Sequence, residues 1–410
     1  MCRAGRGAKV TRARAVVIGA GIGGLAAAAG LRLAGWDVIV CERAASLEPA
    51  GAALALAPNG LRALDVIGAG DGLRGLAVAQ EVGIRRSDGR WLTRSTTGRM
   101  ISDRFGDPVI LLPRTAVIDA LAACLPGGVL SLATEVTSAE PGGKAGPGGT
   151  ATARVVTTAG ELAADLVVAA DGIGSGTRSA LFPGHPGLRY AGFTTWRLLT
   201  GPVTGQFPMA ESWGRGTVFG VMPLSDGRVY CYAAAPADPG ARAGDELAGL
   251  VRLFGTWHEP IPGLLAAGRP QDVLRHDVAE LAAPLPSFHH GRTALLGDAA
   301  HPMTPNLGQG ACQALEDAAV ISRLAAGTEP DAVPAMLARY TADRLPRTTD
   351  VVRWSRRAAT MTTWASPPAV AFRNTVVRLT GKLAPGAALR SLAPIYGWQP
   401  PAAARPGDAG

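Results

Sequence analysis

Lysine and aromatic residues are scarce in this chain of 410 residues. Only Lys9, Lys144 and Lys382 are lysines, and aromatic residues make up 5%. The formal charge of +8 therefore comes from arginines that are spread along the chain rather than clustered. Phosphate binding needs clustered basic residues, and base binding needs stacking surfaces, so nucleic acid is not expected as a partner.

Cysteine is also scarce, and long apolar runs are missing. The five cysteines are odd in number and form no C-x-x-C pair, which argues against a disulfide framework or a zinc site: Cys2, Cys41, Cys124, Cys231 and Cys312. We therefore expect a protein of the reducing cytoplasm. No run of 18 uncharged apolar residues occurs beyond the N-terminal region, so no membrane span is expected. The apolar stretch at 15–30 has the composition of a signal peptide, but its spaced glycines favour a folded domain.

Glycine and proline are too few for a low-complexity or collagen-like chain, with 54 and 31 residues. A composition that is 47% hydrophobic and 18% charged instead predicts a sizeable buried core and about two domains.

A glycine-rich turn lies between a strand predicted at 15–18 and a helix predicted from Gly23. The sequence GAGIGG at 19–24 satisfies G-x-G-x-x-G. The first glycine permits the tight turn, the second lets a pyrophosphate approach the backbone, and the third lets helix and strand pack closely. Glu42 ends the next strand, where a carboxylate can accept hydrogen bonds from ribose hydroxyls. The motif predicts a dinucleotide site and leaves NAD and FAD open.

Two further motifs follow in the chain. The first is DGIGSGTR at 171–178, and the second is GDAAHP at 297–302, followed by Pro305 and by GQG at 308–310. With the glycine fingerprint, they resemble the single-component (class A) FAD-dependent monooxygenases, or aromatic hydroxylases, with the para-hydroxybenzoate hydroxylase fold. The three motifs cover about 15–320. Within this family, the local sequence pattern of the chain is most similar to the branch of urate, 3-hydroxybenzoate and 6-hydroxynicotinate hydroxylases.

The resemblance implies an α/β fold with a discontinuous Rossmann-like FAD-binding domain, an inserted strand-rich α+β substrate domain and a C-terminal helical segment. We expect the FAD-binding domain at 14–76, 106–187 and 287–352, the substrate domain at 77–105 and 188–286, and the C-terminal segment and tail at 353–410. Local patterns predict strands at 130–139, 152–158 and 162–170, a flexible loop at 141–149, and helices at 115–125 and 311–326. Gly227 after Asp226 predicts a hairpin.

The resemblance also implies roles for individual residues. Asp298 would meet the ribityl and pyrophosphate side of FAD, and the helix after Gly310 would point its N-terminus at the flavin N1/C2=O edge, where negative charge grows on reduction. Pro305 would lie by the face of the flavin that carries oxygen, as the catalytic position. The expected FAD-binding residues are Gly19, Gly21, Ile22, Gly23, Gly24, Glu42, Arg43, Arg114, Val136, Asp171, Asp298, Gly308, Gln309, Gly310 and Ala311.

Structural roles are an alternative at several positions. Asp171 or Asp298 could cap the turn that follows it. His301 and the pair Glu316 and Asp317 are expected to support packing, and Cys312 is expected to be a small buried residue. The other histidines considered lack metal spacing, so no metal is expected: His258, His276, His289 and His290.

The chain has a single G-x-G-x-x-G, so no second Rossmann domain for a pyridine nucleotide is expected. The resemblance nevertheless implies that NADH or NADPH binds transiently as the electron donor. FAD is reduced, O₂ forms a flavin C4a-hydroperoxide, and oxygen passes to an aromatic or polyketide-type small molecule. Three alternatives stay open: epoxidation of an isoprenoid or polyene, an FAD reductase without oxygen transfer, and a non-catalytic flavin-binding module. A halogenase is disfavoured because W-x-W-x-I-P is absent. The protein is expected to be a monomer or homodimer.

The substrate is expected between the flavin and the strand-rich section 188–236. Urate-type members place an arginine four residues before a Met-Pro pair, where this chain has Val218. Urate is therefore disfavoured, and a larger, less polar substrate is favoured. The candidate substrate contacts are Trp196, Arg197, Trp213, Phe219, Met222, Tyr230 and Asn306.

Overall fold

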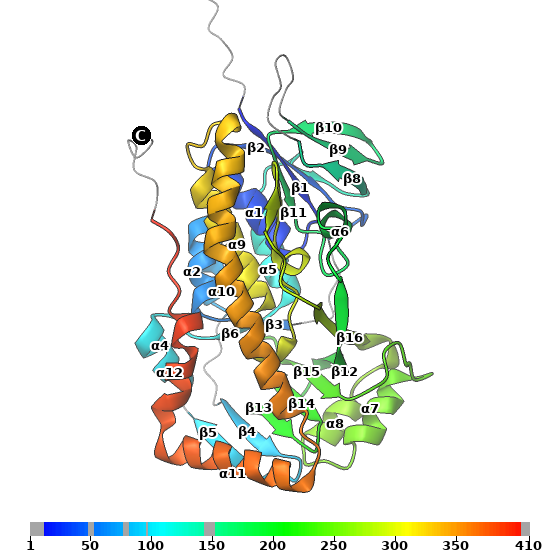
Figure 1. Ribbon diagram of the computed structural model, residues 1–410. Helices are drawn as coiled ribbons and strands as arrows, with labels where there is room; N and C mark the ends of the chain where they lie inside the picture. The colour runs from blue at the N-terminus through cyan, green and yellow to red at the C-terminus, as the bar shows by residue number, and fades with distance from the viewer. Residues whose placement is uncertain (1–11, 48–52, 77–81, 96, 143–151, 403–410) are drawn as a thin grey trace, which may run out of the picture.

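The computed structural model describes residues 12–47, 53–76, 82–95, 97–142 and 152–402. The loop expected at 141–149 and the first residues of the chain lie largely outside this part. The fold is a mixed α/β arrangement with two large sheets, one in the upper half of Figure 1 and one in the lower half.

The upper sheet has six strands in the order β17-β18-β11-β1-β2-β7. Its pairs are parallel except for β17 with β18. Residues 15–18 of the central strand are buried, as expected for a parallel strand covered on both faces. The strands are β1 (Arg14–Ile18), β2 (Asp37–Cys41), β7 (Leu130–Ser131), β11 (Leu166–Ala169), β17 (His289–His290) and β18 (Thr293–Leu295).

Two predicted strands are in fact divided between sheets, and those two predictions were wrong. The segment 162–170 breaks at Asp165, so that β10 (Gly160–Ala164) joins a three-stranded sheet while β11 enters the parallel sheet. The segment 130–139 likewise divides into β7 and β8 (Val136–Glu140). The third strand of the small sheet is β9 (Ala153–Thr157). A continuous apolar run does not indicate where the backbone leaves one sheet for another.

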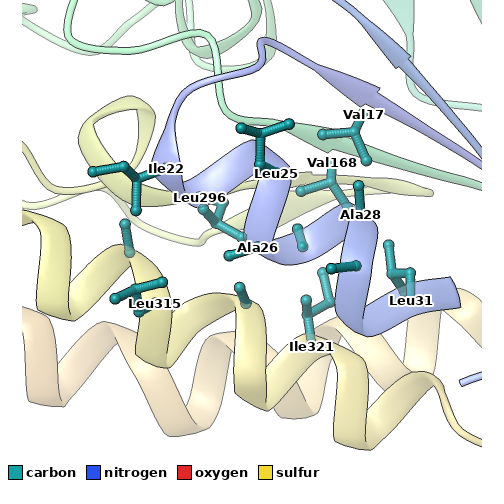
Figure 2. Close-up of a cluster of buried hydrophobic side chains, with 14 of the residues drawn as sticks. Val17, Ile22, Leu25, Ala26, Ala28, Leu31, Val168, Leu296, Leu315 and Ile321 are labelled. Carbon is teal, nitrogen blue, oxygen red and sulfur yellow. The ribbon is translucent and has the colours of Figure 1, made fainter. Parts of the chain in front are cut away.

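Helix α1 (Ile22–Leu33) follows β1 and packs against α9 (Gly310–Ala325), as Figure 2 shows. A Cβ on Gly30 would lie 2.0 Å from Ser322 Oγ, so the two helices approach closely at this glycine. Helices α2 (Pro58–Ile67) and α5 (Arg114–Ala123) also contact α1, and β3 (Ala53–Leu56) contacts α9. The other elements before the lower sheet's long strands include α3 (Asp71–Arg74), α4 (Thr97–Phe105), β6 (Ile110–Pro113) and α6 (Gly176–Leu181).

The lower sheet has seven strands in the order β16-β12-β15-β14-β13-β4-β5. Its hairpin between β14 and β15 turns at Gly227, which has a φ of 81°, as the sequence predicts. Helices α7 (Glu246–Phe254) and α8 (Ile261–Ala266) pack on one face. The strands are β4 (Val82–Arg86), β5 (Trp91–Ser95), β12 (Leu188–Pro202), β13 (Met209–Trp213), β14 (Val218–Pro223), β15 (Arg228–Ala235) and β16 (Val273–Leu281).

The C-terminal part is helical. The 30-residue helix α10 (Val333–Thr362) runs down the molecule past both sheets in Figure 1. Helix α11 (Pro367–Leu383) contacts β5, and α12 (Pro385–Tyr396) returns to α2. In the part of the chain that the structure describes, no helix combines the length and the apolar character needed to cross a membrane.

Candidate functional site

A cavity of about 610 Å³ brings together residues that are far apart in the sequence. Its walls come from the start of α1, the β3–β6 pair, one face of the lower sheet, the segment that leads into α9, and the end of α10. It therefore contains parts of the first and third motifs together with the strand-rich section, and Gly172 brings in the second motif.

Each glycine of the fingerprint has a different environment. Gly19 has a φ of 96°, and a Cβ there would lie 2.6 Å from the carbonyl oxygen of Ala170. A Cβ on Gly24 would lie 1.9 Å from the carbonyl oxygen of Gly19. A Cβ on Gly21 would have no atom within 4 Å, and this residue lines the cavity at the N-terminus of α1, where no side chain caps the helix. Space beside an uncapped helix N-terminus suits a phosphate group.

A second helix N-terminus faces the same cavity. The short turn Pro305–Leu307 ends at Gly308, which has a φ of 61°, and α9 then begins without a side-chain cap. Pro305, Gly308 and Ala311 line the cavity. This turn is fastened to α10, because Thr304 Oγ1 lies 2.9 Å from Ser355 Oγ and Asn306 donates to Thr362 Oγ1 at 3.2 Å.

The middle motif supports the third motif through backbone contacts. Asp171 accepts hydrogen bonds from Ser175 Oγ at 2.6 Å and from the N–H of Thr177 at 3.1 Å, so it stabilises the start of α6. Arg178 is buried and donates to the carbonyl oxygens of Ile173 at 2.6 Å and Ala299 at 3.1 Å. Asp298 is exposed and lines the cavity.

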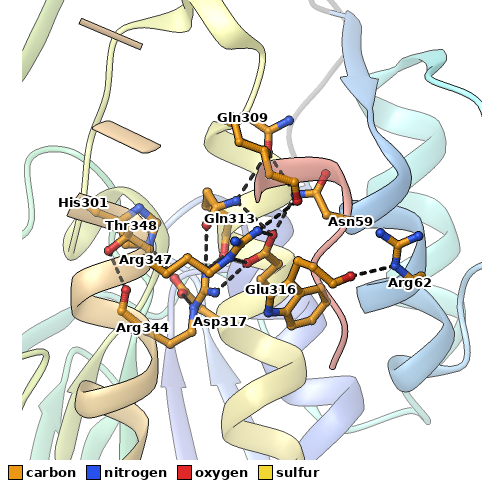
Figure 3. A network of polar contacts seen from close by, with 12 residues as sticks. Asn59, Arg62, His301, Gln309, Gln313, Glu316, Asp317, Arg344, Arg347 and Thr348 are labelled. Carbon is orange, nitrogen blue, oxygen red and sulfur yellow. Dashed lines mark hydrogen bonds and ion pairs between the residues drawn. The ribbon is translucent and has the colours of Figure 1, made fainter. Parts of the chain in front are cut away.

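Beneath the start of α9 lies a buried polar network, shown in Figure 3. Arg344 of α10 donates to Glu316 at 2.5 Å and to Asp317 at 2.6 Å, and all three side chains are at most 1% exposed. Arg347 adds a second cation on Glu316 at 2.6 Å. Three cation–carboxylate contacts of this kind compensate charges that would otherwise be costly to bury.

The network extends to the loop that precedes α9. Asn59 of α2 donates to both Gln309 at 2.9 Å and Glu316 at 2.7 Å. His301 contacts Asp317 at 2.6 Å, and the N–H of Gly297 donates to the same carboxylate oxygen at 2.9 Å. The network thus holds the third motif and the loop before α9 in place. This agrees with the supporting roles expected for His301, Glu316 and Asp317.

The charges in this network predict how the stability of the fold depends on pH. Burial alone would raise the pKa of Glu316, but Arg344, Arg347 and Asn59 outweigh burial and hold this pKa below its ordinary value. The pKa of Asp317 is likewise lowered against burial by His301 and Arg344. A carboxylate with a lower pKa in the folded protein adds stability above its unfolded pKa and loses it as the pH falls through the folded value.

We therefore expect the free energy of unfolding to decrease as the pH falls below about 4. Urea unfolding at constant ionic strength between pH 7 and pH 3 measures this dependence. A free energy that stays constant over the whole range would contradict the assigned charge states.

The face of the lower sheet that borders the cavity follows strand alternation. Four of the candidate substrate contacts line the cavity, namely Arg197, Trp213, Met222 and Tyr230, and so does Val218. Trp196 and Phe219 do not line the cavity, so the structure does not support these two candidate substrate contacts. Both lie in the core on the other face, where Trp196 Nε1 donates to Glu246 at 2.7 Å and Phe219 packs against Phe254.

The remaining predicted residues divide into those that line the cavity and those that do not. Those that line the cavity are Gly21, Ile22, Gly23, Arg114, Asp298, Pro305, Asn306, Gly308, Gly310 and Ala311. Those that do not are Gly19, Gly24, Glu42, Arg43, Val136, Asp171 and Gln309. Glu42 accepts hydrogen bonds from the N–H groups of Ala20 at 2.7 Å and Ala44 at 2.9 Å, so it fixes the backbone at the fingerprint.

Sequence reasoning missed Glu211 and Tyr232, which also line the cavity. Alternation from Trp213 along β13 and from Tyr230 along β15 leads to both residues. Strand alternation is therefore the sequence signal that identifies Glu211 and Tyr232.

The buried thiols do not offer a nucleophile. Burial raises the pKa of Cys231 to about 12 and that of Cys312 to about 12, so both stay protonated near neutral pH. Among the described residues, no group of three or more histidine, cysteine or acidic side chains could hold a metal ion.

Comparison with known proteins gives consistent similarities. A family model described as an FAD binding domain matches residues 12–355. The aurachin C monooxygenase/isomerase of Stigmatella aurantiaca is 34% identical over 371 residues, which cover 89% of this chain and 93% of that protein. The 3-amino-4-hydroxybenzoate 2-monooxygenase of Streptomyces cremeus is 34% identical over 354 residues, covering 84% and 86%. The solved structure of Klebsiella pneumoniae HpxO with FAD and uric acid has a TM-score of 0.81 at 28% identity, covering 89% of this chain and 92% of that chain.

Proposed function

The chain belongs to the FAD-binding-domain family of class A flavin monooxygenases, and from this premise we propose that it hydroxylates an aromatic or polyketide-type small molecule with NADH or NADPH and O₂. It is an FAD-dependent monooxygenase, and therefore an oxidoreductase. The identity of the electron donor and the class of substrate are the parts that we propose.

The observation that carries the proposal is the convergence of two uncapped helix N-termini on one cavity. The residues fit FAD, because Gly21 leaves open space where a Cβ would otherwise project. The backbone at Gly21 and Ile22 would hold the pyrophosphate, and Asp298 would accept hydrogen bonds from the hydroxyl groups of the cofactor. The start of α9 would face the flavin edge that becomes negative.

Bound FAD supplies the electron transfer and the activation of oxygen. The chain's own contribution is to position the reactants and to limit access of water. Pro305 would lie beside the flavin ring, held by the fastening of the neighbouring Thr304 to α10. Met222, Val218 and Tyr230 provide a largely apolar wall for the substrate.

Two features support the choice of substrate. The relatives include enzymes named for an aminohydroxybenzoate and for aurachin C. Val218 lies on the cavity wall where the resemblance to urate-type members calls for an arginine. We therefore propose an aromatic substrate other than urate, in a two-part arrangement with FAD bound mainly by the parallel-sheet half and substrate bound against the seven-stranded sheet.

A reduction assay tests this function. Purified protein is expected to contain FAD, and NADH or NADPH should bleach the flavin faster when an aromatic substrate is bound, as measured anaerobically by stopped-flow absorbance. A screen of aromatic compounds identifies those that accelerate bleaching. Flavin that is reduced without any response to aromatic ligands would instead favour an FAD reductase.

A further inference from the structure

Four residues on neighbouring strands form a polar row across the apolar wall of the cavity: Arg197, Tyr232, Gly220 and Glu211. Strand register places Arg197 of β12 opposite Tyr232 of β15, Tyr232 opposite Gly220 of β14, and Gly220 opposite Glu211 of β13. Arg197, Tyr232 and Glu211 all line the cavity. The row thus carries a cation at one end and a carboxylate at the other, separated by three strand spacings, or about 14 Å between backbones.

Gly220 allows the row to form. A Cβ at this position would lie 2.1 Å from a ring carbon of Tyr232, so the tyrosine side chain occupies the space above the glycine. From there the Tyr232 hydroxyl crosses β14 and donates to Glu211. A side chain at position 220 would separate this pair.

Two hydrogen bonds hold the Glu211 carboxylate in place, and its oxygens can accept more. It accepts hydrogen bonds from the Tyr232 hydroxyl and, at 2.8 Å, from Trp213 Nε1. An ionised carboxylate can accept about four hydrogen bonds, so acceptor capacity remains toward the cavity. Neither of its two hydrogen-bonding partners is a cation.

The other end of the row carries the opposite charge. Within the residues that the structure describes, no hydrogen bond or ion pair of the Arg197 side chain is found, although its charge lowers the pKa of the neighbouring Tyr230 against a larger rise caused by burial. The rows on either side are mostly apolar, with Met222 and Tyr230 on one side and Val218 and Ala234 on the other.

We propose that Glu211 determines specificity by accepting a hydrogen bond from an N–H or O–H donor on the substrate, while Arg197 faces an acceptor or anionic group at the opposite end. The inference rests on the proposed function and narrows it to aromatic compounds that are polar at both ends, such as amino-substituted arenes. Such a ligand lies along the row with its ring between the apolar residues. The substrate is thereby oriented as well as bound.

Paired probes that differ by one donor test this inference. Equilibrium dialysis of the holoenzyme compares 4-aminobenzoate with 4-methylbenzoate, in which a methyl group of similar size replaces the amino group and no N–H or O–H donor remains at that end. The wild type should bind the amino compound about tenfold or more tightly, as expected for a hydrogen bond to a charged group. Glu211→Gln, which keeps the shape but not the charge, should remove most of this preference while 4-methylbenzoate binding stays nearly unchanged.

Glu246→Gln is the matched control, because Glu246 accepts the Trp196 indole N–H on the far face of the same sheet, outside the cavity. This variant should keep the wild-type preference. Equal affinity of the wild type for both probes, no detectable binding of either, or an unchanged preference in Glu211→Gln would overturn the proposal and leave Glu211 as an anchor for Trp213 and Tyr232. FAD content and flavin reduction by NADH or NADPH, measured on the same samples, report separately on the proposed function.

Discussion

Replacing Gly21 by alanine should weaken FAD binding while leaving the apoprotein folded. The added Cβ meets no atom of the protein within 4 Å, and the backbone φ of −71° suits alanine. The small loss at a helix N-cap is comparable to the gain from a less flexible unfolded chain, so the free energy of unfolding should change by less than about 1 kcal/mol. The same Cβ occupies the space that a pyrophosphate needs, so FAD affinity should fall by more than about tenfold.

Gly24→Ala provides the contrast. Its Cβ would lie 1.9 Å from the carbonyl oxygen of Gly19, so the strand and helix must separate and the apoprotein itself should be destabilised. Urea unfolding of both apoproteins and their FAD content after reconstitution separate the two effects. Full FAD content in Gly21→Ala would show that the cofactor does not pass this glycine.

Replacing Arg344 by methionine should cost about 3–5 kcal/mol of stability, because two buried carboxylates lose a shared cation. Glu316 would keep Arg347, and Asp317 would keep His301. Burial would then raise the pKa of the carboxylates, so the difference from the wild type should be largest near pH 7 and should shrink as the pH approaches 4. Urea unfolding at several pH values measures both features.

Arg353→Met is the matched control on the same helix. Arg353 is 61% exposed and forms a surface ion pair with Asp350, so its loss should change stability by less than about 0.5 kcal/mol. A loss below about 1 kcal/mol in Arg344→Met would mean that the network does not hold the start of α9.

The sequence indicates most strongly those features that depend on local backbone geometry. The turn at 19–24, the hairpin at Gly227 and the helix that begins at Gly310 were all predictable, because glycines with special environments or positive φ mark them. Their assembly around one cavity agrees with the resemblance, since three separated motifs of one family imply a shared site.

Other features depend on long-range contacts that a single chain pattern does not encode. The sheet change at Asp165 occurs inside an apolar run, and Trp196 and Phe219 differ from their cavity-lining neighbours only by the phase of the strand. The partnership of Glu316 with Arg344 spans 28 residues and two helices. Only the packing of α9 against α10 brings these charges together.

The central claim is that this chain transfers oxygen from air to an organic substrate by means of bound FAD. Its most direct test is turnover under ¹⁸O₂ with NADH or NADPH and a substrate from the aromatic screen, followed by mass spectrometry of the product. We expect one ¹⁸O atom in each hydroxylated product molecule. Product without the label, or oxidation of NADH or NADPH with no oxygenated product for any compound that accelerates flavin bleaching, would contradict it.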